Sequence, residues 1–333
     1  MSLLIGTSDG VFLIDQLGAP PSDGALTGCA VHALRQANGS ILAGASDGVY
    51  RSDDAGRSWR PSGCSGQDVW AIAASPSRRG LVYVGTHPAG LVRSTDDGRS
   101  WTPVPSLTEV PGAERWCLPS DPNGSRALAI ALDPAQPDHL WVGIEVGGIL
   151  ETSDGGESWT FTLAGRNPDI HGLVRDPVRP DVLYAATGYG RFEPNDPMEP
   201  AGVYRSEDGG ESWQYAWPDA ERRWTRPICV DARPPYALTA AACPNFQSTE
   251  SDPGGAQSVL YQSTDCARSW RSLGDAAHTP SAANITAIAV DPSRAGSVVV
   301  GMENGEVWRV SAYAEWSRLA RGLPRVQALH LTG

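Results

Sequence analysis

The segment STDDGRSW (94–101) decides the fold, because its pattern S/T-x-D-x-G-x-S-W returns along the chain. We call this pattern the hairpin motif; its other copies are SDDAGRSW (52–59), TSDGGESW (152–159), SEDGGESW (206–213) and STDCARSW (263–270), the last with Ala267 in the glycine position. In each copy the Asp and Ser side chains can bond local backbone N–H groups, Gly permits a positive φ, and Trp can fill the gap between neighbouring sheets. The motif therefore predicts a hairpin that recurs around an all-β repeat structure.

Two apolar strand patterns each recur seven times around these hairpins. The first is VHAL (31–34), VWAI (69–72), ALAI (127–130), IHGL (170–173), PICV (227–230), ITAI (285–288) and VQAL (326–329). The second is LLIG (3–6), ILAG (41–44), LVYVG (81–85), HLWVG (139–143), VLYAA (182–186), ALTAA (237–241) and SVVVG (297–301). Because the second series begins before the first, the N-terminal segment should supply strands two to four of the blade whose inner strand is the C-terminal VQAL. The sequence predicts one domain over residues 1–333, an all-β seven-bladed β-propeller closed by this pairing of its ends.

The hairpin motif resembles the Asp-box, or bacterial neuraminidase, repeats of sialidases, xyloglucanases, sortilin-type receptors and the photosystem II assembly factor. The resemblance implies a propeller whose Asp boxes are structural and lie away from any active site. It does not imply one function, because these families include hydrolases, receptors and scaffolds. For a sialidase it implies an arginine triad with an early Arg-Ile-Pro motif and a Tyr–Glu pair. The nearest string, TRPI (225–228), lies in the wrong part of the chain, so sialidase activity is not expected.

Composition excludes several partners and mechanisms. The net charge is −12, which disfavours nucleic acid, and all 26 basic residues are arginine, which excludes lysine-based catalysis. No apolar run approaches the length of a membrane span, so we expect no membrane partner and a cytoplasmic location. The six cysteines form no C-x-x-C pair and are expected to be reduced thiols.

Chemistry is expected on the face that carries the long loops 105–126, 187–201, 217–226, 242–257 and 273–284, because function tends to reside on long loops of a rigid scaffold. The second residue of each inner strand should lie at the channel mouth on this face: His32, Trp70, Leu128, His171, Ile228, Thr286 and Gln327. The residues that follow the second strands should join them: Ser8, Ser46, His87, Glu145, Tyr189, Cys243 and Glu303. Together these residues predict a pocket of mixed polarity.

Three of these residues on consecutive blades, His87, Glu145 and His171, form a candidate ligand set for one divalent metal ion. The alternative is that His32 and His171 are channel-lining histidines satisfied by backbone carbonyls or water, and that His87 and Glu145 are solvated loop residues.

Arginine and aromatic residues are also concentrated in the predicted mouth loops. The candidate ligand-binding residues are His32, Trp70, Arg115, Trp116, Arg166, Tyr189, Arg191, Trp224, Arg226 and Gln327. Guanidinium groups beside aromatic rings suit a small anionic molecule or a saccharide. The alternative is that these arginines form ordinary surface ion pairs.

The sequence therefore favours a hydrolase of glycosidase type, or a lyase, that acts on a small polar, anionic or glycosidic ligand in the mouth pocket. The candidate catalytic residues are His171, Glu145 and Glu303. A second hypothesis is a non-catalytic binding or assembly propeller that holds an acidic partner through Arg222, Arg223 and Arg226. A third is a protein that binds sugar through Trp116, Trp224 and Tyr189 without turnover.

Overall fold

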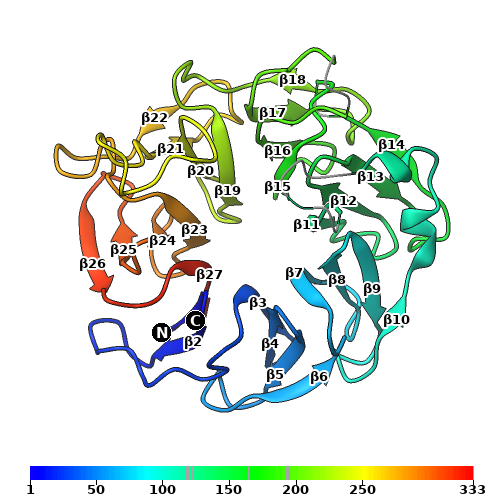
Figure 1. Ribbon diagram of the computed structural model, residues 1–333, viewed down its shortest axis with the longest axis horizontal. Coiled ribbons are helices and arrows are strands. Elements are labelled where there is room, and N and C mark those ends of the chain that lie inside the picture. Colours follow the sequence, from blue (N-terminus) through cyan, green and yellow to red (C-terminus); the bar gives the residue numbers. More distant parts are fainter. Residues whose placement is uncertain (117–120, 122–123, 164, 193–195, 333) are drawn as a thin grey trace.

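The protein forms a ring of seven antiparallel sheets around a central channel, as the sequence predicts (Figure 1). The computed structural model describes residues 1–116, 121, 124–163, 165–192 and 196–332. The innermost strands are β3 (Val31–Ala37), β7 (Asp68–Ala74), β11 (Ala127–Leu132), β15 (Ile170–Arg175), β19 (Trp224–Val230), β23 (Ile285–Val290) and β27 (Val326–Thr332). All seven contain the predicted inner-strand segments.

The second strands pair with the inner ones and are almost entirely buried, since they are covered by neighbouring blades on both faces. They are β1 (Ser2–Thr7), β4 (Ser40–Ala45), β8 (Val82–His87), β12 (Leu140–Ile144), β16 (Leu183–Thr187), β20 (Leu238–Cys243) and β24 (Val298–Met302). The third strands are β2 (Gly10–Ile14), β5 (Gly48–Ser52), β9 (Gly90–Ser94), β13 (Gly148–Thr152), β17 (Gly202–Ser206), β21 (Val259–Ser263) and β25 (Val307–Val310). The outer strands are β6 (Arg60–Gly63), β10 (Thr102–Pro103), β14 (Thr160–Thr162), β18 (Gln214–Tyr215), β22 (Arg271–Ser272) and β26 (Trp316–Ala320).

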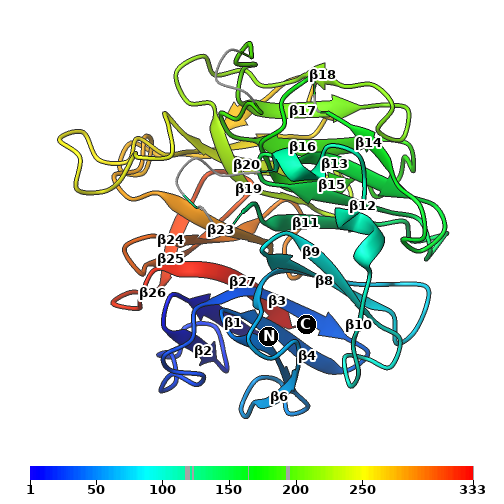
Figure 2. The ribbon, with the colours of Figure 1, turned by 45° about the vertical axis from the view of Figure 1, so that its right-hand side comes forward.

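The two ends of the chain close the ring. Strand β1 pairs antiparallel with β27, with Leu4 opposite His330, and the Ser2 and Thr332 hydroxyl oxygens lie 2.5 Å apart. Figure 2 shows β27 beside β1, and in Figures 1 and 2 the N and C termini are adjacent. The predicted closure is therefore confirmed.

The closing blade differs from the prediction in its outer strand. Its described sheet has only the order β2, β1, β27, and the fourth position holds an isolated bridge between Val11 and Ala25. The segment DQLGAPPSDG (15–24) is rich in proline and glycine and lacks the hairpin motif, so it cannot form a regular outer strand here.

The hairpin motifs lie between the third and outer strands and hold the turn through one repeated network. In the first copy the Ser52 hydroxyl donates to Asp54 at 2.8 Å and accepts from the Gly56 N–H at 2.8 Å. Asp54 also accepts from the backbone N–H and the hydroxyl of Ser58, at 2.8 and 2.5 Å. The same bonds form in the other four copies. At the glycine position φ is positive, +90° at Gly56, and even Ala267 has φ 60°.

This network predicts acid sensitivity. The Ser58 hydroxyl and backbone hold the pKa of Asp54 at about 2, and the corresponding bonds of Ser100 and Ser212 hold the pKa values of Asp96 and Asp208 at about 2. A depressed carboxyl pKa stabilises the fold above the unfolded pKa of about 4, and this contribution is lost as pH falls through the folded value. The melting temperature should therefore fall between about pH 4 and pH 2, and Asp54→Asn should make this fall shallower. A variant with the wild-type pH profile would contradict the assignment.

Helices and cysteines add little to the framework of strands in the described part of the chain. The described helices are two short 3-10 turns, η1 (Pro105–Thr108) and η2 (Ala113–Arg115), and within the described residues no helix is long and apolar enough to cross a membrane. Five cysteines (Cys29, Cys64, Cys229, Cys243 and Cys266) are free thiols. Cys117 lies outside the described residues.

Candidate functional site

A bulge near the start of each inner strand builds the channel mouth. In β15, for example, Ile170 pairs with Thr187 and Gly172 with Ala186, so His171 has no partner residue. The same register shift occurs in all seven inner strands. Because a bulge re-aims the unpaired side chain, these residues line the cavity. Six of them are the predicted mouth residues: His32, Trp70, Leu128, His171, Thr286 and Gln327.

The fifth blade corrects the prediction of Ile228 at the mouth. Thr225 pairs with Ala242 and Ile228 with Ala240, so Arg226 and Pro227 form the bulge. The Thr225 hydroxyl donates to the carbonyl oxygens of Thr187 and Gly202, which fixes this register. Arg226 thus takes the mouth position, and Ile228 joins a lower ring of aliphatic side chains. That ring is Leu34, Ile72, Ile130, Leu173, Ile228, Ile288 and Leu329.

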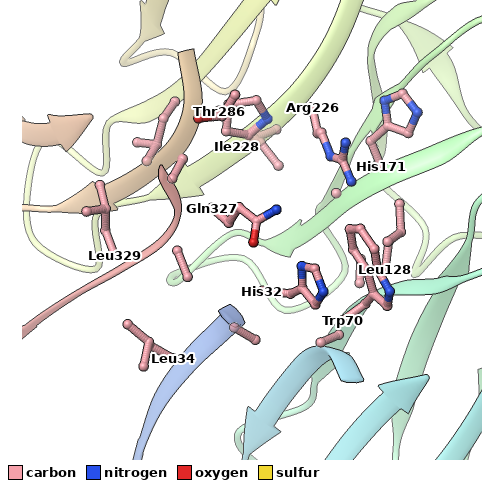
Figure 3. A pocket seen from close by; sticks show the side chains of 18 of the residues that line it. His32, Leu34, Trp70, Leu128, His171, Arg226, Ile228, Thr286, Gln327 and Leu329 are labelled. Carbon is pink, nitrogen blue, oxygen red and sulfur yellow. The ribbon is translucent and has the colours of Figure 1, made fainter. Parts of the chain in front are cut away.

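The resulting cavity has a volume of about 470 Å³ and opens at the channel mouth (Figure 3). In Figure 3 the His32, Trp70, Arg226 and Gln327 side chains lie around one space, with His171 at its edge. The buried oxygen Oε1 of Gln327 and nitrogen Nδ1 of His32 have no hydrogen-bond partner within the described residues. A cavity with unpaired polar atoms in its wall, beside a ring of apolar side chains, is suited to a small polar ligand or ordered water.

Trp70 supports the charged groups of this wall. His32 stacks on it with ring centroids 3.9 Å apart and an interplanar angle of 10°, and the indole N–H of Trp70 donates to Asp68 at 2.7 Å. The guanidinium carbons of Arg126 and Arg226 lie 4.7 and 5.6 Å from the centroid of the ring. Trp70 is therefore a cation–π support for two arginines rather than a free face for a sugar.

Glu145, Asp169 and His171 form a buried cluster beside the cavity. One donor atom from each lies within 4.8 Å of the others. His171 Nδ1 lies 2.7 Å from the Thr225 carbonyl oxygen, so Nδ1 carries a hydrogen. Nε2 then faces Asp169 Oδ1 at 3.2 Å and Glu145 Oε1 at 4.0 Å. Burial alone lowers the pKa of His171, but the charges of Asp169 and Glu145 outweigh it and raise that pKa.

The predicted metal set is therefore brought together only in part. Glu145 and His171 meet, but Asp169 completes the cluster in place of His87. His87 lies between Asp68 and Asp121, with nitrogen–oxygen distances of 3.6 and 3.2 Å. Arg126 links the two regions, because it donates to Asp121 at 3.1 Å and to Glu145 Oε2 at 2.9 Å.

Arg226 has no hydrogen bond or ion pair within the described part of the chain. Burial lowers its pKa; the charge of Glu145 opposes this, and the positive charges of Arg325 and Arg126 add to it. Arg325 also lines the cavity. A guanidinium that lies beside other cations and over the Trp70 ring, with no hydrogen bond or ion pair from the described residues, is prepared to bind an anion.

The other predicted residues lie outside the described lining of this cavity. Trp224 contacts His171 edge to face at 4.9 Å, and Trp116 packs against a blade core and lines a separate surface pocket. Arg115 lies over Phe192 at 4.8 Å. Tyr189 is partly buried in a loop, and Arg166 and Arg191 are exposed.

Glu303 has a local structural contact instead of a place in the cavity. Its Oε1 accepts from the backbone N–H groups of Glu250 and Asn284, at 2.8 and 2.9 Å. These bonds join two of the long loops. We therefore assign Glu303 to loop anchoring and leave it out of the proposed chemistry.

Sequence reasoning missed Asp68, Asp121, Arg126 and Asp169. One signal for two of them is visible in the chain: Asp68-Val-Trp70 and Asp169-Ile-His171 each place Asp two residues before a mouth residue. Residues two apart on a strand share a face. The rule that placed Trp70 and His171 at the mouth could therefore have placed these two carboxylates near it as well.

Comparisons with known proteins agree with this fold. No protein-family model matches the chain. The oligoxyloglucan-reducing end-specific xyloglucanase of Emericella nidulans is 30% identical over 113 residues, which is 32% of this chain and 12% of the relative. The chain thus aligns with only a small part of that enzyme's length.

Solved structures give fuller coverage. The GH74 enzyme of Niastella koreensis matches with a TM-score of 0.64 and 17% identity, over 94% of this chain and 46% of that one. YCF48 of Cyanidioschyzon merolae matches with a TM-score of 0.58 and 16% identity, over 88% and 87%. The chain has the propeller fold of GH74 enzymes and YCF48. At these identities the likeness concerns the fold alone.

Proposed function

We propose that this propeller is a hydrolase of glycosidase type, or a lyase, that acts on a small anionic saccharide at the channel mouth. The observation that carries the proposal is Arg226, a guanidinium without a hydrogen-bond partner among the described residues, in the same cavity wall as His171 of the carboxylate–imidazole cluster. The partial likeness to a xyloglucanase and to GH74 enzymes supports the glycosidase class. A cytoplasmic location and the Asp-box identity of the hairpin motif belong to the same proposal.

The side chains divide into two roles. Arg226, with Arg325 and Gln327 nearby, binds the anionic group of the substrate. Glu145, Asp169 and His171 then act on the bond that is broken. Two carboxylates so close together would repel unless a positive charge lies between them, and His171 Nε2 faces both oxygens. This arrangement can hold and move a proton, or hold a cation that polarises the substrate.

The first experiment is turnover of fluorogenic glycosides that share one leaving group and differ in charge: neutral glucosides, uronides and sialosides. We expect uronide or another anionic glycoside to be cleaved, or converted to an unsaturated product, faster than the neutral ones. His171→Ala should abolish this turnover while the melting transition remains cooperative. A preference for neutral glycosides, or full activity in His171→Ala, would refute the proposal.

The alternative is a non-catalytic binding or assembly propeller, which the likeness to YCF48 favours. Fewer of the predicted arginines are available to bind an acidic partner. Arg222 already bonds Asp219 and the Gln257 carbonyl oxygen, and Arg226 lines the cavity. If anionic sugars bind without conversion, this alternative replaces the enzyme proposal.

A further inference from the structure

We propose that Glu145, Asp169 and His171 bind one divalent transition-metal ion, of the zinc or manganese type, at the side of the channel mouth. A role of this metal ion in turnover rests on the proposed function. Metal binding by the three residues, in contrast, can be tested without any substrate. Two carboxylates and one imidazole are a donor set that suits such ions.

The spacing of the donors is close to that of a coordinated ion. Ligand atoms about 2.1 Å from one zinc ion in a tetrahedral arrangement lie about 3.4 Å from each other. Asp169 Oδ1 already lies 3.2 Å from His171 Nε2. Glu145 Oε1 lies 4.0 Å from the same nitrogen, so a small side-chain rotation closes the set.

Each ligand is oriented by a second contact, as in known metal sites. His171 Nδ1 donates to the Thr225 carbonyl oxygen at 2.7 Å, which leaves Nε2 for the metal. Glu145 Oε2 accepts from Arg126 at 2.9 Å, which leaves Oε1 directed toward the cluster. The neighbouring Gly188 has no room for a side chain, since a Cβ there would lie 2.4 Å from Asp169 Oδ2 and from His171 Cε1.

Asp169 supplies an independent sign of a missing partner. The residue is only 6% exposed, and its Oδ1 has no hydrogen-bond partner among the described residues although it points into the cluster. In the described part of the chain, only His171 Nε2 lies against this oxygen, at 3.2 Å, and a cation bound between the two atoms would satisfy both. Because His171 also lines the cavity, an ion held here would keep open positions toward a substrate.

A second histidine with two carboxylates provides a contrast within the same chain. His139 lies 3.5 Å from Asp133 and 2.8 Å from Glu151. Asp133, however, accepts from the backbone N–H groups of Ala135 and Gln136, and Arg175 lies 3.3 Å from the same oxygen. Asp133 is already satisfied by these contacts and Glu151 bonds the other ring nitrogen of His139, so this trio should not bind metal.

The test is equilibrium dialysis of chelator-treated protein against Zn²⁺, Mn²⁺ and Ca²⁺, with metal measured per chain. We expect one equivalent of Zn²⁺ or Mn²⁺. Asp169→Asn and Glu145→Gln should each weaken binding by at least roughly 10-fold, whereas the matched variant Glu151→Gln should not. For a readout on the unsubstituted chain, Co²⁺ should give a visible absorption spectrum that Zn²⁺ abolishes.

The outcomes separate this inference from the proposed function. A folded wild-type chain that binds no stoichiometric metal, or equal weakening in Glu151→Gln and Asp169→Asn, overturns the metal site. If metal-free protein still turns over substrate, the protein is an enzyme but the metal ion has no part in its reaction. Specific metal binding with no turnover of any glycoside leaves the metal site standing and removes the enzyme proposal.

Discussion

Replacing Arg226 by methionine is expected to lower kcat/KM for an anionic substrate by roughly 100-fold or more, because a buried charge-assisted hydrogen bond is lost. The same change should raise the urea midpoint of the free protein. Burial lowers the pKa of Arg226, and no hydrogen bond from the described residues offsets the cost of desolvating its charge. Methionine keeps the length of the side chain and removes that cost. Steady-state kinetics and urea unfolding of the same preparation measure both effects.

A matched control lies on a hairpin motif. Arg268 is exposed, and its ion pair with Glu207 is 3.6 Å long, so Arg268→Met should change neither quantity appreciably. If Arg226→Met kept wild-type kcat/KM, the anion-binding role would be refuted. If it lowered the urea midpoint, Arg226 would be a structural residue and not a site held ready for a ligand.

The fold is predictable because its signals are local and repeated. The motif at 94–101 needs only its own side chains and backbone to form, and the offset between VQAL (326–329) and LLIG (3–6) is enough to indicate the closure. The outer strand of the closing blade is not predictable by the same rule, because residues 15–24 contain no copy of the motif. Periodicity thus predicts the ring well and its exception poorly.

The site is predictable only where it follows the repeat. His32, Trp70 and His171 take their places because the bulge recurs at one position of every inner strand. Arg226 escapes that rule because the apolar pattern begins at Pro227, whereas the strand itself begins earlier and Thr225 pairs before the bulge. Contacts between blades, such as Arg126 over the ring of Trp70, depend on loop paths that no periodic pattern specifies.

The sequence also does not predict which tryptophans are fully buried in the core. The sequence predicts that the hairpin-motif tryptophans plug the gaps between sheets, but each is only partly buried. Trp159, for example, donates from its indole N–H to the Ser106 hydroxyl at 3.0 Å while part of its ring stays exposed. The most deeply buried tryptophan is Trp141, on β12, which lies outside the motif.

Trp141→Ala is therefore expected to cause the largest loss of stability among the tryptophans, about 3–5 kcal/mol in the free energy of unfolding. Trp141 is 1% exposed, and its indole N–H donates to the Gly209 carbonyl oxygen of the next hairpin motif at 2.9 Å. It packs with Leu173 and Tyr204 of the neighbouring blade, so its removal opens a cavity between two sheets. Urea unfolding gives the free energy directly.

Trp159→Ala is the matched comparison, because it removes the same side chain one blade interface away. Its loss should be smaller, about 1–3 kcal/mol, since part of the ring is already in water. Equal losses in the two variants would mean that the hairpin motif contributes as much to the packing between blades as the buried second strand does. A larger loss for Trp159→Ala would place the main contact between blades at the motif itself.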